Sequence, residues 1–163
     1  MGPFDNPENV VHAINSLDAK IALAEKNDEK IKKYKTLFTT TLIKDSSYSI
    51  QNKYVLANIF IYLNEIDSAI NLLETEIPKE ENNGRNYIVV KLLVTLTQAY
   101  YQKGSLQKSI DTIEKALNLA EQERYVRLLI DGGSTIKELI QNILSANKTQ
   151  SNESPAKIKY LSQ

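Results

Sequence analysis

The chain has 163 residues with 20 Lys and Arg against 20 Asp and Glu, so its formal net charge is zero. Its length fits a single domain, and 42% hydrophobic and 25% charged residues are typical of a soluble globular protein. Because phosphate binding needs an excess of basic side chains, a neutral chain is a poor candidate for coating DNA or RNA. The absence of cysteine excludes disulfides, thiolate nucleophiles and Cys-based zinc or iron–sulfur sites.

Neither a membrane span nor a secretory signal is predicted. No window reaches about 18 uninterrupted apolar residues, and residues 1–9 lack the basic and apolar regions of a signal peptide. We therefore expect a cytoplasmic chain without membrane contact.

Apolar residues recur every three or four positions along most of the chain, which predicts helices. The predicted helices cover about residues 8–25, 28–43, 50–63, 66–77, 86–103, 106–120 and 136–144. Pro78 is expected to end the fourth helix and begin a polar loop over residues 79–85. Gly104 is expected to supply the left-handed residue after the fifth helix. The stripe expected to face the core on the first helix comprises Val11, Ile14, Leu17, Ile21 and Ala24.

An internal repeat with an offset of 40 residues aligns residues 56–74 with residues 96–114. Phe60 then falls on Tyr100, and the small residue Ala69 falls on the small residue Ser109. Two antiparallel helices with a small residue at their crossing form a unit that buries its apolar face only by stacking on copies of itself. We therefore predict an all-α fold, a right-handed α-α superhelix of about three helix pairs plus a C-terminal helix. Tyr34 and Tyr100 are assigned to the core between helices.

Residues 93–120 resemble a tetratricopeptide (TPR) repeat, so the expected fold is a TPR-like solenoid. The aromatic, glycine, small, large apolar and alanine positions of that motif correspond to Tyr100, Gly104, Ser109, Ile113 and Ala116. There is no Trp, Thr97 replaces the usual small residue, and the period of about 40 residues exceeds the usual 34.

A more specific likeness covers residues 116–144, which are similar to the end of the sensor domain in MalT-like, large ATP-binding transcription activators of the LuxR type. The matching residues are Ala116, Leu117, Ala120, Glu121, Tyr125, Val126, Arg127, Asp131, Gly133 and Leu139. Gly132 stands where that family often has an acidic residue. The likeness extends over residues 86–144 and, more weakly, over residues 51–77. For the first 45 residues, the helical prediction is based on apolar periodicity alone.

The MalT-like resemblance implies a sensor that binds a small inducer or a protein or peptide partner and relays occupancy to self-assembly and DNA binding. The P-loop and helix-turn-helix of that family have no counterpart in these 163 residues. We expect an excised piece of a regulator, with a helical-repeat domain over residues 1–146 and a flexible linker over residues 147–163 towards a missing DNA-binding domain. No direct nucleic-acid contact is expected, and homo-oligomerisation stays open. The alternative is a free-standing TPR adaptor that binds protein or peptide partners.

The candidate binding face lies on the first helix of each stacked pair, which lines the concave side. Phenol and amide groups there suit sugar, peptide or aromatic ligands, although Tyr54 and Tyr62 packing with hydrated hydroxyls is an open alternative. The two predicted rows are Gln51, Tyr54, Asn58, Ile61 and Tyr62, and Lys91, Val94, Gln98, Tyr101 and Gln102.

No catalytic constellation, metal site or cofactor site is predicted, and the chain is not expected to be an enzyme. The single histidine, His12, lacks a Ser–Asp context. The carboxylate pairs Glu74/Glu76 and Glu80/Glu81 are expected to lie on a solvated surface rather than to perform acid–base chemistry. Residues 131–133 are interpreted as a turn before a helix cap at Thr135, and the basic run over residues 26–35 as a solvated helix face.

Overall fold

The computed structural model describes residues 7–44, 49–125, 127, 129, 133 and 136–141. Six helices follow one another in chain order, namely α1 (Pro7–Ala24), α2 (Asp28–Lys44), α3 (Ile50–Tyr62), α4 (Ile66–Asn82), α5 (Asn86–Gln102) and α6 (Leu106–Glu123). Residues 136–141 are also helical, and no strand occurs among the described residues. The predicted all-α helical-repeat fold is therefore confirmed. The predicted linker over residues 147–163, Asp131 and the predicted cap at Thr135 lie outside the described residues.

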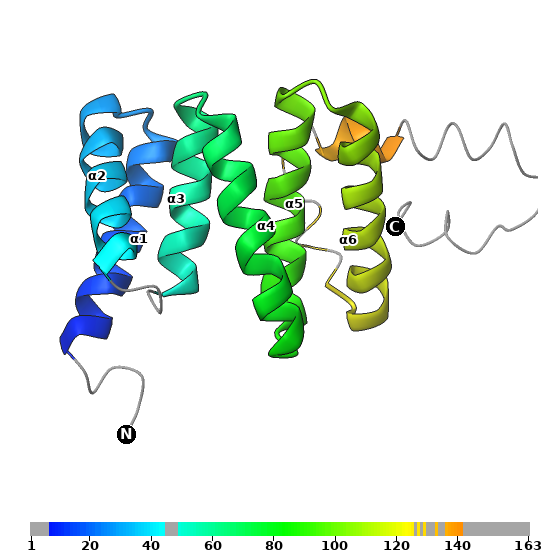
Figure 1. Ribbon diagram of the computed structural model, residues 1–163, viewed down its shortest axis with the longest axis horizontal. Helices are drawn as coiled ribbons and strands as arrows, with labels where there is room; N and C mark the ends of the chain where they lie inside the picture. Colours follow the sequence, from blue (N-terminus) through cyan, green and yellow to red (C-terminus); the bar gives the residue numbers. More distant parts are fainter. Residues whose placement is uncertain are drawn as a thin grey trace, which may run out of the picture. The chain divides into compact units, whose positions relative to one another are not determined.

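The chain forms two compact units, residues 1–85 with α1 to α4 and residues 86–163 with α5 and α6. In the first unit α3 packs against α1, α2 and α4, and in the second α5 packs against α6 (Figure 1). Each unit thus contains at least one antiparallel helix pair of the predicted repeat.

The described turns after α1, α3, α4, α5 and α6 are of one kind, each with a residue of positive φ between 53° and 77°. After each such residue, the next backbone N–H donates to the carbonyl five positions earlier, over 2.8–3.0 Å, which is the Schellman helix end. The positive-φ residues of the turns are Lys26, Asn64, Gly84, Gly104 and Arg124. Asn64 and Gly104, like Gly84 and Arg124, are 40 residues apart, so the turns carry the period predicted from the apolar pattern. The left-handed conformation predicted for Gly104 is confirmed.

The prediction that Pro78 ends the fourth helix is wrong, because α4 continues to Asn82. Proline removes one backbone hydrogen bond from a helix, but the following turn is held by tertiary packing. Ile77 and Glu80 are both buried on the side of α4 opposite the exposed Pro78. The helix ends instead at the Gly84 turn, four residues beyond Glu80.

The prediction that the apolar stripe of α1 faces the core is also wrong. Ile14 and Leu17 are each 60% exposed. The face of α1 that packs inside the unit carries small residues instead, and they are Ser16, Ala19 and Ala22. Small side chains let neighbouring helices approach closely, so the large core side chains of this unit come from α2, α3 and α4 rather than from α1.

Tyr34 and Asp18 tie α2 to α1. The Tyr34 hydroxyl donates to Asp18 Oδ2 over 2.6 Å, and the ring packs beside Phe38. The hydrogen bond to Asp18, together with burial, raises the pKa of Tyr34 to about 12. The same hydrogen bond, assisted by Lys30, lowers the pKa of Asp18 although partial burial acts in the opposite direction. The prediction that Tyr34 belongs to the core is confirmed.

The second unit is built on α5, most of whose surface is buried. At the crossing of α5 and α6 the Ser109 hydroxyl donates to the Thr97 carbonyl over 3.1 Å, and both residues are fully buried. Tyr100 is buried as predicted. The small residue expected at the crossing is therefore Ser109, and the crossing tolerates Thr97 because its hydroxyl donates to the Leu93 carbonyl within α5.

Candidate functional site

The first predicted binding row lies on α3. Its first four positions are three or four residues apart, and Tyr62 follows Asn58 by four, so all five share one side of the helix. Gln51 and Tyr62 are exposed, and the other members, Tyr54, Asn58 and Ile61, are half-buried. The Asn58 amide donates to the Tyr54 carbonyl over 2.8 Å, which orients it along the helix.

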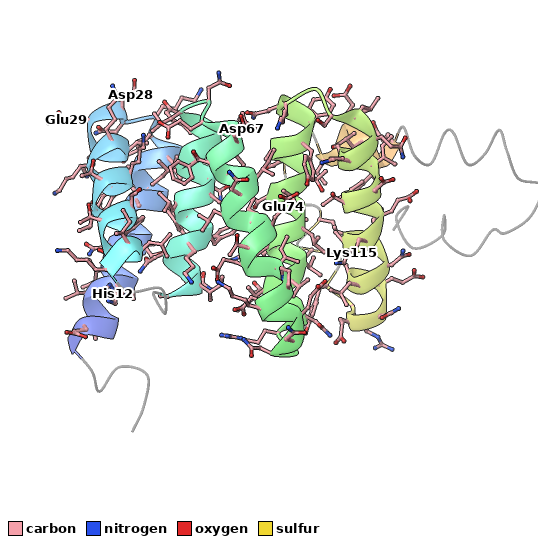
Figure 2. All side chains as sticks on the ribbon, viewed as in Figure 1. His12, Asp28, Glu29, Asp67, Glu74 and Lys115 are labelled. Carbon is pink, nitrogen blue, oxygen red and sulfur yellow. The ribbon has the colours of Figure 1, made fainter. Side chains whose placement is uncertain are left out.

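Tyr62 is held in place from α2. Its hydroxyl donates to Asp28 Oδ1 over 2.8 Å, and Figure 2 shows Asp28 at the first turn of α2. This hydrogen bond raises the pKa of the Tyr62 phenol. Tyr62 thus presents an exposed ring whose polar tip is already bound, so a ligand meets mainly the apolar body of this side chain.

The second predicted row lies on α5. Tyr101 and Gln102 are exposed and Lys91 and Gln98 half-buried, whereas Val94 is buried. The exposed polar character of this row is therefore concentrated in the last turn of α5, at Tyr101 and Gln102.

An aromatic cluster at the start of α5 was not identified from the sequence. The Tyr87 and Tyr125 rings meet edge to face with centroids 5.5 Å apart, and the Lys91 ammonium lies 5.8 Å from the Tyr87 centroid. The four-residue spacing of Tyr87 and Lys91 predicts the contact between the Lys91 ammonium and the Tyr87 ring, because side chains four apart on a helix are neighbours. Tyr125 comes from beyond α6, and no local pattern reveals that pairing.

A buried polar cluster at the α3–α4 packing was also missed. Lys53 Nζ lies 3.0 Å from Glu76 Oε2, and both side chains are 7% exposed. Lys79 Nζ reaches the other oxygen of Glu76 over 2.7 Å. Burial of Glu76 acts to raise the pKa of its carboxyl, but the hydrogen bonds from Lys79 and Lys53 outweigh burial and the pKa is lowered.

Two further polar groups are buried in the α3–α4 pair. The Nε atom of Arg85 lies 2.8 Å from Glu80 Oε2, an ion pair not aligned as a hydrogen bond. The side-chain amide of Asn52 is fully buried and meets no hydrogen-bond partner among the described residues. The expectation that Glu76 and Glu80 lie on a solvated surface is therefore wrong. Glu76 lies on the face of α4 that packs against Lys53 of α3, and Glu80 is buried because α4 continues past Pro78.

Chemically, these carboxylates neutralise cations, and each already has a cationic partner. His12, shown in Figure 2 on α1, is half-buried and belongs to none of the ion pairs described for α3 and α4. Among the described residues, no group of three His, Cys, Asp or Glu side chains comes together that could hold a metal ion. No described helix is long and apolar enough to cross a membrane.

A family model, described as the MalT-like TPR region, matches residues 8–146. The chain belongs to the MalT-like TPR family. This match includes α1 and α2, where the sequence analysis relied on periodicity alone, and it confirms the resemblance drawn from residues 116–144. Among the described residues of this MalT-like TPR chain, the helix pairs α1–α2, α3–α4 and α5–α6 form three repeats. Neither a curated protein nor a solved structure matches the chain.

Proposed function

We propose that this MalT-like TPR chain is the signal-sensing and protein-interaction module of a MalT-like transcription activator. It binds an inducer or a partner on the α3 row or on the α5 row, each taken within its own unit, and it relays occupancy to self-assembly and DNA binding carried out by other domains. The observation that carries this proposal is the family match over residues 8–146.

The side chains exposed on the first helices of the repeats support the proposal. Tyr62 and Tyr101 are each somewhat more than one third exposed, and each offers a flat apolar ring. Gln102 adds an exposed amide next to Tyr101 at the end of α5, and Gln51 adds one at the start of α3, at the opposite end of the helix from Tyr62. Such a mixture of stacking surfaces and hydrogen-bonding groups suits small polar aromatic molecules, sugars and extended peptides.

A thermal-shift screen of sugars, aromatic metabolites and short peptides tests this function. A ligand that binds only the folded chain stabilises it by about 2.7 kcal/mol at a hundredfold excess over its Kd. We expect Tyr101→Ala to abolish the shift while the unliganded melting temperature changes little, because the Tyr101 ring is partly exposed.

Leu106→Ala is the matched control, since Leu106 is an exposed side chain on α6 outside both rows. It should leave the ligand-induced shift intact. A ligand shift that survives Tyr101→Ala places binding elsewhere, and the absence of a shift with any ligand class contradicts sensing by these rows. A shift with peptides alone favours the adaptor function.

A further inference from the structure

Helix α1 carries an apolar stripe on the face directed away from its own unit. Ile14 and Leu17 are 60% exposed and Ile21 is 42% exposed. On a helix with 100° per residue these side chains lie opposite the buried Ser16, Ala19 and Ala22. A helix that is apolar on the outer side as well as closely packed on the inner side is built for a second contact.

The stripe has the spacing of a coiled coil. Alternating steps of three and four residues connect Ile14, Leu17, Ile21 and Ala24, and the half-buried Val10 continues this spacing, whereas the exposed Val11 falls outside it. These are heptad positions, with Ile14 and Ile21 at a, Leu17 at the central d, and Val10 and Ala24 at the outer d positions. Because β-branched residues at a with leucine at d favour two parallel strands, this sequence is suited to pairing with one other helix in the same direction.

The equivalent face of the next repeat is covered by helices. Lys26 and Asn64 occupy the same turn position 38 residues apart, so Leu17 and Ile21 of α1 correspond to Val55 and Ile59 of α3. Val55 and Ile59 are almost completely buried, in a helix that packs against α1 and α2. The exposed positions on α1 therefore correspond to positions that, on α3, are covered by neighbouring helices.

Charged residues on the two flanks of the stripe complement each other. Lys20 lies at heptad position g on α1. Glu25 lies in the turn directly after α1, where its N–H still donates to the Ile21 carbonyl, so it continues the register at position e; both side chains are exposed. Neither forms an ion pair within the part of the chain that the structure describes. In a parallel pair of identical helices, g of one chain meets the following e of the other, so Lys20 and Glu25 would pair twice.

We propose that the α1 stripe binds a second copy of this chain, with the two α1 helices parallel about a twofold axis. The heptad spacing, the Ile and Leu distribution and the Lys20–Glu25 complementarity argue for this occupant together. The proposal is independent of ligand binding on the α3 and α5 rows, because α1 contributes to neither row.

The dimer is expected to be weak and concentration-dependent. The stripe spans residues 10–24, about 21 Å of helix at 1.5 Å per residue, which is a small interface. Sedimentation velocity of the whole chain from about 5 to 500 µM should show a shift from monomer to dimer. A chain that stays monomeric over this range, because another segment or no partner covers the stripe, overturns the proposal.

Leu17→Asp places a charge at the centre of the stripe and should leave only monomer at all these concentrations. Leu106→Asp is the matched control on the exposed start of α6 and should dimerise like the unmodified chain. Circular dichroism must show unchanged helicity in both variants. A folded Leu17→Asp chain that still dimerises overturns the proposal.

A charge exchange tests the parallel register. Lys20→Glu and Glu25→Lys alone should each weaken dimerisation about fivefold to tenfold, since each places like charges opposite one another at two sites. The double variant should return to within about twofold of the original Kd, because both pairs are restored in reverse. A double variant as weak as the single variants contradicts the parallel pairing, and its recovery supports it.

Discussion

The α3–α4 pair of the first unit and the α5–α6 pair of the second share a backbone pattern but differ in what they bury. At an offset of 40 residues, Lys53 and Glu76 correspond to Leu93 and Ala116. All four are nearly inaccessible. The neighbouring positions show the same exchange, since Asn52 and Glu80 stand where the second pair has Leu92 and Ala120.

The turns and the helix crossing determine which positions are buried, whereas the side-chain chemistry at those positions is free to vary. An apolar pair such as Leu93 and Ala116 stabilises through burial alone. A buried ion pair must first lose the hydration of both charges, so Lys53 and Glu76 contribute less than their mutual attraction suggests. We therefore expect the packing of α3 on α4 to depend on keeping both charges together.

Removing one charge should have the largest effect. Glu76→Ala introduces the residue of the second pair but leaves the Lys53 ammonium buried without its closest partner. We expect a loss of about 3–5 kcal/mol in the free energy of unfolding, measured by urea titration followed by circular dichroism. Glu74→Ala, at an exposed position of the same helix, is the control and should change stability by less than about 0.5 kcal/mol.

Replacing both charged residues should raise the free energy of unfolding instead of lowering it. Lys53→Leu combined with Glu76→Ala reproduces the Leu93 and Ala116 pair and removes the hydration cost of both ions. We expect stability between that of the original chain and about 4 kcal/mol above it, in the same urea titration. A double variant as unstable as Glu76→Ala would show that the two helix pairs are not equivalent in packing.

Acid titration provides an independent check on the same pair. The pKa of Glu76 is lowered in the folded chain, so its contribution is complete above the ordinary glutamate pKa of about 4.5 and is lost as the pH falls through the folded value. The double variant should show a shallower fall in stability over that acidic range. Equal acid sensitivity of the two proteins would assign the pH dependence to other carboxylates.

A smaller effect is expected at the turns, which differ at corresponding positions 64 and 104. Gly104→Val should cost about 1–2 kcal/mol, because its φ of 77° strains a β-branched residue although no atom lies within 4 Å of the added Cβ. Asn64→Gly should stabilise the chain by less than about 1 kcal/mol by relieving the same conformation. Both are measured as changes in urea midpoint, and an unchanged midpoint for Gly104→Val would contradict the strained cap.

Much of the fold is predictable from local sequence. The apolar period places the helices, the recurrence of Phe60 and Tyr100 places the repeat, and Gly104 marks a helix end. The candidate binding rows follow from the repeat register alone and stay a prediction on α3 and α5. The buried polar cluster is not predictable in this way, since a glutamate four residues from another looks the same on a solvated helix as on a packed one.

The helices, their 40-residue period and the membership of the MalT-like TPR family follow from the order and spacing of residues along the chain. Packing between helices decides that α4 continues through Pro78, that Glu76 and Glu80 are buried, and that the apolar stripe of α1 faces outward. These features depend on which neighbouring helix covers each face. A periodic pattern shows that a helix has an apolar side, but packing determines what that side meets.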